Sequence, residues 1–513
     1  MNNLFRLFYS KFKVSKMGKK YFATSLILFL LLVIFLSLNF SNRFNNFIFS
    51  NVINPYDPLK VNKNANIKEK IVDQGYWKDP RGIFPIFAYN TPDSSKDLVS
   101  SLQIIADGGI NIIINANLSW MPFPNQVKEA FKKLGNSNLM WLTYITNECR
   151  DDYITGNTND KTNKHIQNYL KEFDDNFVYG WYIWDEPGSN RKPCSPLNLF
   201  PNDDNADINI IDKQIRSDST FNKKLDFINL FPSYWSGTPT FKKYANYVDT
   251  FMSSQEFKPR VLCFDNYPLL KAECGDFRKD YYANLEIIRE KSLEYNIPFW
   301  NIVLSSEHLS YKNPSFEEIS LQVYSALAYG AKGIGYYLYS KSWENVGYKS
   351  WILENYVDNT NVADSLHGRL YLPVKILNRQ IQALGKTLLD LESTEVIHSS
   401  NFPNGQKDIS QSVLSNDSSN SFIKNIININ DPKSDPKVLI GIFRSRINRN
   451  DNGTYLLVVN KNVVSGVNVE ILLNNVMNIN KFNKENGEPI FLYQNDLIKV
   501  SILPGSGELF YTN

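Results

Sequence analysis

The chain has 513 residues, of which 43% are hydrophobic and 21% are charged, and its formal net charge is +3. This length favours two folded domains rather than one small core. The first twenty residues contain six basic residues and no acidic one, which leaves the rest of the chain at −3. A weakly acidic remainder lacks the basic stripe that nucleic-acid binding requires, so nucleic acid is excluded as a partner.

Residues 21–40 form an apolar run without a charge, which is long enough to cross a bilayer as a helix. Basic residues precede this run and only Arg43 follows it closely, so the positive-inside rule places the N-terminus in the cytosol. A cleaved signal peptide is the alternative, although its apolar region is normally shorter. We expect a single-pass type II membrane protein with a cytoplasmic tail over residues 1–20, a signal-anchor over 21–40, a stalk over 41–74 and a lumenal or extracellular remainder.

Strand-like and helix-like segments then alternate over residues 75–371. The predicted strands cover residues 82–89, 111–117, 139–146, 178–187, 225–230, 260–267, 299–304 and 332–339. Residues 188–223 show weak periodicity and are expected to form a long irregular insertion. Eight alternating β–α units of this length predict a TIM (β/α)₈ barrel. An open doubly wound sheet is the alternative, but no glycine-rich phosphate loop follows the first strand.

Residues 372–391 are amphipathic and predict a linker helix, after which the pattern changes to short strands without helices. The clearest strands cover residues 438–444, 454–459, 467–473, 497–503 and 507–511. This pattern predicts an antiparallel β-sandwich over residues 392–513, with a long loop at 401–435. The sequons that begin at Asn416 and Asn452 are expected glycan acceptors in loops.

The fourth predicted strand ends in Trp-Asp-Glu-Pro, at the mouth where barrel enzymes keep their chemistry. Aromatic rings stack on sugar faces, and desolvation beside them raises the pKa of a carboxyl group. Glu186 is therefore the candidate general acid of a glycoside hydrolase. Adjacent strand residues point to opposite sides, so Asp185 is expected to orient a sugar hydroxyl or a loop. A solvated acidic turn is the alternative interpretation.

Glycoside hydrolysis needs a second carboxylate on the other side of the scissile bond. Glu307 follows the seventh predicted strand and Asp265 ends the sixth, and the sequence leaves both open for this role. Asp265 is equally compatible with an Asx turn before Pro268, and Glu307 with a solvated loop. The residues expected to bind substrate at the strand ends are Asp185, Tyr89, Asn115, Trp184, Tyr267, His308, Tyr339 and Trp343.

The segments Trp-Asp-Glu-Pro, Phe-Asp-Asn-Tyr-Pro and Ala-Tyr-Gly-Ala-Lys-Gly-Ile, followed by a β-sandwich, resemble the (β/α)₈ glycoside hydrolases. The resemblance covers residues 80–513 and is to the clan with acid/base and nucleophile glutamates after strands four and seven, which includes the β-galactosidase-like barrels. It implies Glu186 as acid/base and Glu307 as nucleophile. Asp185 replaces the asparagine that contacts the sugar 2-hydroxyl in that clan, which leaves the substrate class open.

The leading hypothesis is a membrane-anchored glycosidase that cleaves a lumenal or extracellular glycan and needs no metal or organic cofactor. A non-catalytic sugar-binding or structural surface protein on the same scaffold is the alternative, because fold does not fix function. Four cysteines without a Cys-x-x-Cys spacing favour disulfides over a metal site. The preferred pairs are Cys149–Cys194 and Cys263–Cys274, and reduced thiols are the alternative.

Overall fold

The structure is a computed structural model, and all the residues that it describes belong to one compact unit, Glu69–Asn513. The described residues are 76–89, 97–114, 124–135, 137–144, 167–168, 170–171, 175–187, 202–236, 241–255, 258–340, 347–354, 367–399, 422–448 and 451–513. The predicted tail, signal-anchor and stalk over residues 1–74 lie outside this set. Within it, no helix is both long enough and apolar enough to cross a bilayer.

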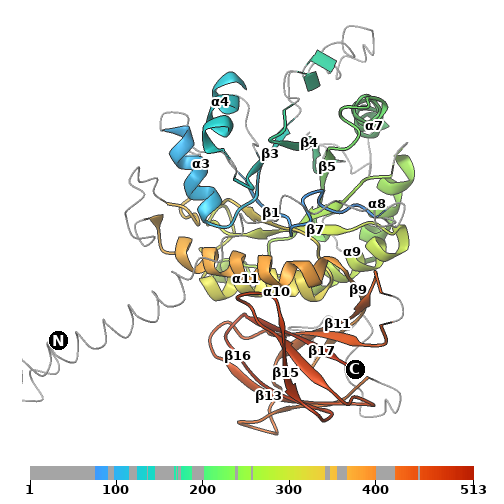
Figure 1. Cartoon of the computed structure of the whole chain (residues 1–513), viewed down its shortest axis with the longest axis vertical. Helices are drawn as coiled ribbons and strands as arrows, with labels where there is room; N and C mark the ends of the chain where they lie inside the picture. The colour runs from blue at the N-terminus through green and yellow to red at the C-terminus, as the bar shows by residue number, and fades with distance from the viewer. Residues whose placement is uncertain are drawn as a thin grey trace, which may run out of the picture. The chain divides into compact units, whose positions relative to one another are not determined.

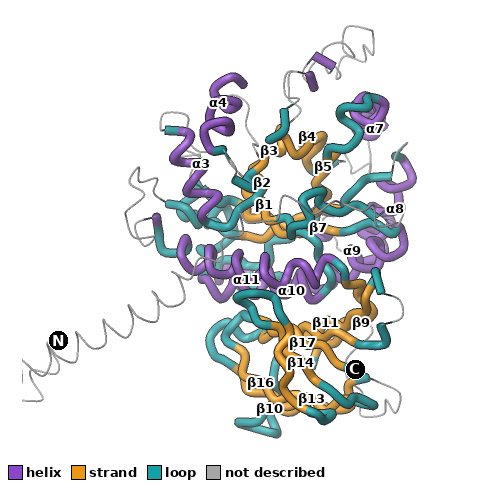
Figure 2. Tube along the Cα trace, viewed as in Figure 1, coloured by secondary structure: helices purple, strands orange, loops and turns teal. Residues whose placement is uncertain are grey.

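Eight parallel strands form a closed barrel, as predicted, and appear as a ring in Figure 2. Each strand pairs with the next along the chain, and the first pairs with the eighth. The strands are β1 (Ile86–Tyr89), β2 (Ile112–Ile114), β3 (Met140–Tyr144), β4 (Val178–Asp185), β5 (Leu225–Leu230), β6 (Leu262–Asp265), β7 (Phe299–Leu304) and β8 (Ile334–Tyr337).

Helices surround the strands and bury one apolar face against them (Figure 1). They are α3 (Leu98–Asp107), α4 (Pro124–Leu134), α7 (Asn202–Ser217), α8 (Phe241–Ser254), α9 (Tyr281–Tyr295), α10 (Phe316–Ala328) and α11 (Tyr371–Leu389), with the short 3₁₀ turns η2 (Ser233–Ser236) and η3 (Ala272–Cys274). Helix α7 corrects the irregular insertion that was predicted for residues 188–223. It forms because Ile208, Ile211 and Ile215 recur at helical spacing and are all buried.

The barrel interior is filled by alternate residues of its strands, many of them aromatic. The Phe87 ring packs 5.4 Å from Trp300 and 5.9 Å from Phe227, measured between ring centres. Gly335 of β8 lies beside Phe87, where a Cβ atom would approach the ring to 2.1 Å. The interior is therefore a packed core, and open space for a ligand is expected only at the ends of the strands.

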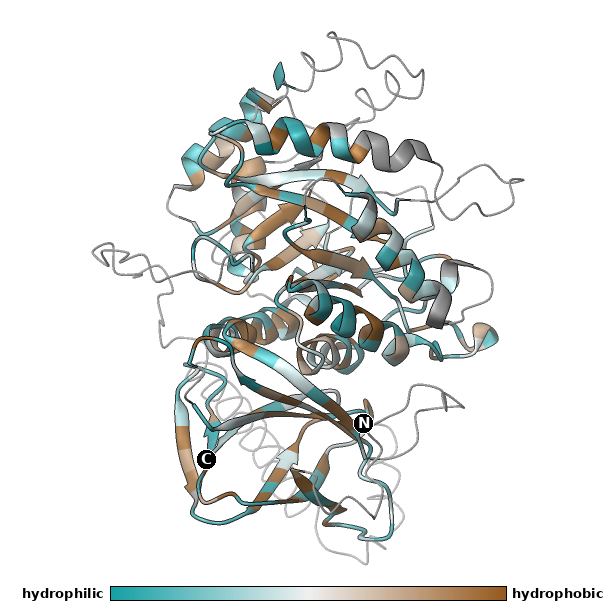
Figure 3. Cartoon of the chain, turned by 90° about the vertical axis from the view of Figure 1, so that its right-hand side faces the viewer, coloured by the Kyte–Doolittle hydropathy of each residue, from teal (hydrophilic) through white to brown (hydrophobic). Residues whose placement is uncertain are grey.

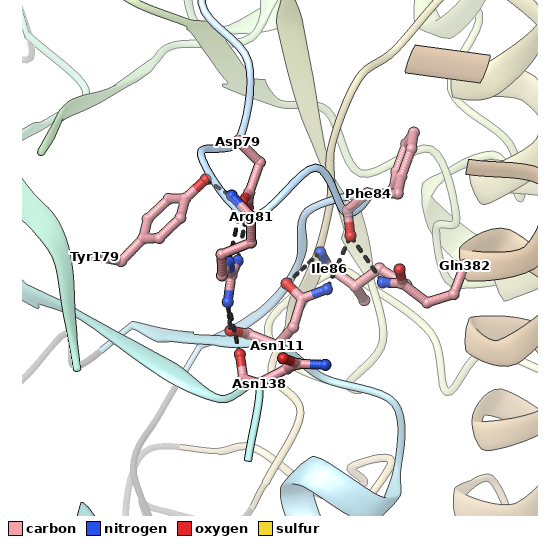
Figure 4. Close-up of polar contacts among 8 residues, drawn as sticks. All are labelled: Asp79, Arg81, Phe84, Ile86, Asn111, Asn138, Tyr179 and Gln382. Atoms are coloured by element: carbon pink, nitrogen blue, oxygen red, sulfur yellow. Dashed lines mark hydrogen bonds and ion pairs between the residues drawn. The ribbon is translucent and has the colours of Figure 1, made fainter. Parts of the chain in front are cut away.

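Polar contacts join the segment before β1 to the residues that precede β2 and β3 and to the start of β4 (Figure 4). Arg81 donates from Nη1 to the backbone oxygens of Asn111 (3.1 Å) and Asn138 (2.6 Å), and it forms an ion pair with Asp79 (2.6 Å). The carboxylate of Asp79 also accepts a hydrogen bond from the Tyr179 hydroxyl (2.9 Å). These bonds satisfy a buried carboxylate and hold two backbone carbonyls at the end of the barrel opposite the strand C-termini, so this end is structural.

In the described residues after α11, nine strands form two antiparallel sheets, which confirms the predicted β-sandwich. They are β9 (Leu391–His398), β10 (Ile423–Asn428), β11 (Val438–Ser445), β12 (Thr454–Asn460), β13 (Val467–Leu473), β14 (Ile479–Phe482), β15 (Pro489–Tyr493), β16 (Leu497–Ile502) and β17 (Gly507–Thr512). One sheet has the order β15-β14-β17-β12-β11-β9 and the other β10-β13-β16, with an apolar core between them. Strand β10 corrects the loop expected over residues 401–435, because Ile423 is buried in that core.

Helices α10 and α11 lie between the barrel strands and the sandwich (Figure 1). Ser320 of α10 donates from Oγ to Gly505 O (2.9 Å), and Lys332 donates from Nζ to Leu391 O (2.6 Å). Gly441 of β11 lies so close to α10 that a Cβ atom would be 2.0 Å from the carbonyl oxygen of Ala328. Figure 3 shows hydrophobic residues along the strands of the barrel and of the sandwich. Barrel and sandwich therefore share a closely packed, largely apolar interface.

The predicted disulfide between Cys263 and Cys274 does not form, because both residues carry free thiols. Cys263 belongs to β6 and its side chain is fully buried inside the barrel, whereas Cys274 is exposed on η3. A thiol enclosed in the barrel core cannot reach a surface turn without disrupting the strand. The other predicted pair, Cys149–Cys194, lies outside the described residues.

Candidate active site

A β-bulge near the end of β4 decides which acidic side chain faces the barrel interior. On β4 the pairing steps from Tyr182 directly to Trp184, whereas on β5 it moves by a single residue. The extra residue shifts the alternation of side chains by one position. Asp185 therefore points inward, where the Tyr182 hydroxyl donates a hydrogen bond to its Oδ1 atom (2.7 Å).

Asp185 and Asp265 flank the side chain of Asn229. Nδ2 of Asn229 donates to Oδ1 of Asp185 (3.2 Å) and to Oδ1 of Asp265 (3.4 Å). The three residues lie at the C-terminal ends of β4, β5 and β6. Since both oxygens accept a hydrogen bond from this one nitrogen, they lie less than about 7 Å apart. The barrel mouth therefore holds a pair of acids at a separation fixed by one amide.

The environment of Asp265 favours its protonated form. Its side chain is buried, and the residue is 7% exposed. Burial, together with the negative charge of Asp185, raises the pKa of Asp265 from 3.8 to about 7, although hydrogen bonds from Asn229 and Tyr267 oppose the shift. Burial therefore favours a proton on Asp265, which is the property that a general acid needs.

Tyrosine side chains line the mouth around these acids. The hydroxyls of Tyr89 and Tyr182 lie 3.0 Å apart, and those of Tyr337 and Tyr348 lie 2.8 Å apart. The rings of Tyr267 and Tyr337 stack at 5.5 Å. Burial raises the pKa of Tyr89 and of Tyr267, and nearby carboxylates add to the shift, so both phenols stay neutral. Flat rings with neutral hydroxyls can both stack on a sugar and bind its hydroxyls.

Glu186 occupies the turn directly after β4. Its backbone is in the left-handed region (φ 51°), and its N–H donates to Asn229 O (2.8 Å). A glutamate with positive φ is uncommon, and such strain is concentrated at functional sites. Burial raises the pKa of Tyr247 on α8, and the charges of Glu186 and Asp265 contribute to that shift. The Glu186 carboxylate therefore lies within electrostatic reach of α8, half-buried at the rim.

Glu307 and His308 follow β7. Glu307 Oε1 lies 3.6 Å from Lys271 Nζ and 3.5 Å from Lys349 Nζ, so two lysines share this carboxylate at the rim. His308 is buried and stacks on Tyr348 with a ring separation of 4.7 Å. Its Nδ1 lies 3.2 Å from Ser306 O, and burial lowers the pKa of His308 to about 4. His308 is therefore a neutral imidazole in the tyrosine-lined part of the mouth.

Two further residues that were expected to bind substrate, Tyr339 and Trp184, do not face the mouth. Tyr339 is fully buried in the layer between strands and helices, where its hydroxyl approaches Gly108. Trp184 packs against the same layer, because the bulge turns it away from the interior. Asn115 and Trp343 lie outside the described residues. Asp185, Asp265, Tyr89, Tyr267 and His308 are the predicted residues that the structure brings together.

The sequence did not single out Asn229, nor did it single out the tyrosines at 311, 337 and 348. A signal for Asn229 was present in the fifth strand, Leu-Asp-Phe-Ile-Asn-Leu, where Leu225 and Phe227 alternate with outward residues. The same alternation turns Asn229 inward at the strand end. Within the described part of the chain, no group of three or more His, Cys, Asp or Glu side chains is arranged to hold a metal ion.

No protein-family model matches the sequence, and no curated protein matches it. Among solved structures, the chain is similar to a β-galactosidase from Bacillus circulans sp. alkalophilus, with 9% identity, a TM-score of 0.52 and coverage of 84% of this chain and 99% of that one. It is also similar to a catalytic mutant of Gan42B, a GH42 β-galactosidase from G. stearothermophilus, with 8% identity, a TM-score of 0.51 and coverage of 84% and 98%. The chain therefore has the (β/α)₈ fold of glycoside hydrolases, as expected.

Proposed function

We propose that this chain is a glycoside hydrolase that cleaves an O-glycosidic bond at the mouth of its barrel. The observation that carries the proposal is the pair Asp185 and Asp265, held on one amide among tyrosines, with the pKa of Asp265 raised to about 7. Hydrolysis of a glycosidic bond needs one protonated and one ionised carboxyl group. The similarity of the fold to β-galactosidases supports this class of enzyme.

In the proposed reaction, Asp265 donates its proton to the leaving oxygen as the bond between that oxygen and the anomeric carbon breaks. The carboxylate of Asp185 attacks the anomeric carbon from the other side and forms a glycosyl ester. Water, deprotonated by Asp265, then hydrolyses this ester and regenerates both groups. The two oxygens that share the Asn229 amide lie less than about 7 Å apart, which is close enough for both carboxyl groups to act on one glycosidic bond.

Glu186 is the competing proton donor, because the resemblance to the clan places its acid/base at this position. Its strained turn at the rim of the mouth supports a functional role. Glu307 is the corresponding competitor for the nucleophile, although two lysines already share its carboxylate. The two assignments predict that activity is lost on substitution of different residues. Isosteric substitution of each acid can therefore distinguish between them.

The decisive experiment is a screen of aryl glycosides with the full chain and with three variants, Asp265→Asn, Asp185→Asn and Glu186→Gln. We expect Asp265→Asn and Asp185→Asn each to lower kcat/KM by at least about 100-fold, because an amide can neither donate the proton nor attack. If Glu186→Gln alone abolishes activity, Glu186 is the acid. If wild-type protein cleaves no glycoside but binds sugars, the chain is a sugar-binding protein and the enzyme proposal fails.

We also propose that the enzyme is anchored in a membrane by residues 21–40, with its barrel on the lumenal or extracellular side. The charge distribution around that apolar run supports this orientation. Asn452 begins a sequon and is exposed, so it would be a glycan acceptor in that compartment. The full chain expressed in eukaryotic cells should lose a glycan on Asn452→Gln. Sensitivity of the barrel to protease added to the cytosolic face would contradict this topology.

A further inference from the structure

Arg278 lies beside the mouth, in the loop that follows β6. Its backbone N–H donates to Pro268 O (2.7 Å), and its Nε donates to Tyr267 O (3.2 Å). The central carbon of its guanidinium group lies 3.6 Å from the centre of the Tyr234 ring. These contacts hold a half-buried guanidinium group in one place before any ligand binds.

The charge of Arg278 is not matched by a carboxylate in the described part of the chain, where no Asp or Glu oxygen lies within 4.0 Å of it. Arginine keeps its charge in proteins and carries five N–H donors in a planar fork. Stacking on Tyr234 uses the face of this fork, Nε donates to Tyr267 O, and one hydrogen bond goes to the Tyr311 hydroxyl, which leaves further Nη donors at the edge. Those donors suit a planar or tetrahedral oxyanion.

Two phenols, Tyr234 and Tyr311, lie beside Arg278 and within electrostatic reach of Asp265. The hydroxyls of Tyr234 and Tyr311 lie 2.9 Å apart. Burial raises the pKa of Tyr234, the negative charge of Asp265 adds to this shift, and the positive charge of Arg278 opposes it. Both charges therefore act on the same pair of hydroxyls. An oxyanion bound by Arg278 would therefore lie beside Tyr234 and Tyr311, whose hydroxyls are within electrostatic reach of Asp265.

We propose that Arg278 forms a subsite for an oxyanion on the substrate, so that the substrate class is an acidic glycan. The oxyanion is the carboxylate of a uronic acid or a sulfate ester, because the guanidinium edge pairs with two oxygens of either group. This inference rests on the proposed glycosidase function and assigns its specificity. Arg278 takes part in binding, and no bond is made or broken there.

The test compares the affinity of the full chain for matched methyl glycosides by calorimetry. The pairs are glucuronate with glucose, galacturonate with galactose, and galactose 6-sulfate with galactose. We expect at least one acidic sugar to bind about tenfold or more tightly than its neutral partner, as a charge-assisted hydrogen bond contributes about this factor. The uronate and sulfate arms show which oxyanion the subsite takes.

Variants assign that preference to the guanidinium group. Arg278→Gln should remove the difference between acidic and neutral sugars, and Arg278→Lys should retain only part of it, because a lysine keeps the charge but loses the fork. Lys279→Gln removes a neighbouring exposed cation and should leave the difference unchanged. If Arg278→Gln does not fold, the selective weakening of acidic-sugar binding in Arg278→Lys provides the test.

Equal affinity for every acidic sugar and its neutral partner, or no binding of any acidic sugar, would overturn the subsite. So would a preference that survives in a folded Arg278→Gln variant. The outcome is separate from the fate of the enzyme proposal. Cleavage of neutral glycosides without a preference for acidic ones removes the subsite alone, whereas tight binding of acidic sugars without cleavage of any glycoside removes the hydrolase alone.

Discussion

Asp185 and Asp265 accept hydrogen bonds from the same nitrogen atom, Nδ2 of Asn229, at 3.2 and 3.4 Å. Three consecutive strands of the barrel thus contribute one acid, one spacer and one further acid. The amide holds the acids close enough for the charge of one to act on the protonation of the other. Asn229 is therefore a positioning residue whose removal should affect both acids.

Substitution Asn229→Ala should change the pH dependence of activity. The hydrogen bond from Asn229 lowers the pKa of Asp265, so its loss should raise that pKa and move the alkaline limb of the kcat/KM profile upward. We also expect kcat to fall about tenfold, because the two carboxyl groups lose their fixed separation. The measurement is a pH–rate profile of both proteins. An unchanged alkaline limb would show that Asp265 is not the group that titrates.

Asp265→Asn should stabilise the fold at alkaline pH while it removes activity. Because burial raises the pKa of Asp265 from 3.8 to about 7, the folded protein binds this proton more tightly than the unfolded chain. The stability that this proton on Asp265 contributes is fully present below pH 3.8 and is lost as the pH rises through about 7. By pH 8 the lost stability is on the order of 4 kcal/mol, which the neutral amide avoids.

Urea unfolding of Asp265→Asn and wild type at pH 5 and pH 8 measures this effect. The free energy of unfolding of the variant minus that of wild type should be larger at pH 8 than at pH 5. Glu485→Gln, at an exposed position of the sandwich, is the matched control and should show no such gain. A difference between Asp265→Asn and wild type that does not change with pH would contradict the raised pKa.

Arg81→Ala should destabilise the barrel strongly, because it leaves the buried carboxylate of Asp79 without its cation. Removal of one partner of a buried ion pair costs about 3–5 kcal/mol. Arg81 also serves the backbone oxygens of Asn111 and Asn138 (Figure 4). Lys78→Ala breaks an exposed pair with Asp390 and should cost about 1 kcal/mol or less. If the two variants lose similar amounts of free energy of unfolding in denaturant, the contacts of Arg81 do not stabilise the barrel more than an exposed ion pair does.

Gly441→Ala should disturb the contact between sandwich and barrel. An added Cβ atom would lie 2.0 Å from the backbone oxygen of Ala328, so β11 or α10 must shift. We expect a loss of about 1–3 kcal/mol, which is the usual effect of overpacking. Thermal unfolding measures the loss, and Val464→Ala, at a position 87% exposed, should leave Tm almost unchanged. A Tm equal to that of wild type would indicate that the two layers are loosely packed.

The barrel could be predicted from the sequence because its strands are short runs buried on both faces and separated by amphipathic helices. All six residues of Phe299–Leu304 are buried, for example, as expected for a short, mainly apolar strand of a parallel barrel. Strand β15 was missed because Pro489, Ile490 and Phe491 are exposed at the sheet edge. Its pairing with β14 defines it as a strand, and pairing is not visible in a single segment.

The candidate site was predictable only in part. Asp265 and Tyr267 were found because both lie at the end of a clear strand, where side chains alternate regularly. The inward direction of Asp185 was not predicted, since a bulge depends on how two strands pair rather than on the residues of one. Asn229 was passed over because an amide carries no distinctive charge, and its role appears only when β4 and β6 lie on either side of it.

The bulge in β4 has a consequence for the transfer of catalytic roles between related barrels. In a regular strand, the same Trp-Asp-Glu-Pro sequence would turn Trp184 and Glu186 inward and Asp185 outward. Two proteins that are identical over these four residues can therefore direct an aspartate in one case and a glutamate in the other toward the barrel mouth. To identify equivalent catalytic acids in two such proteins, one has to compare which residues pair across neighbouring strands. A sequence alignment alone does not identify them.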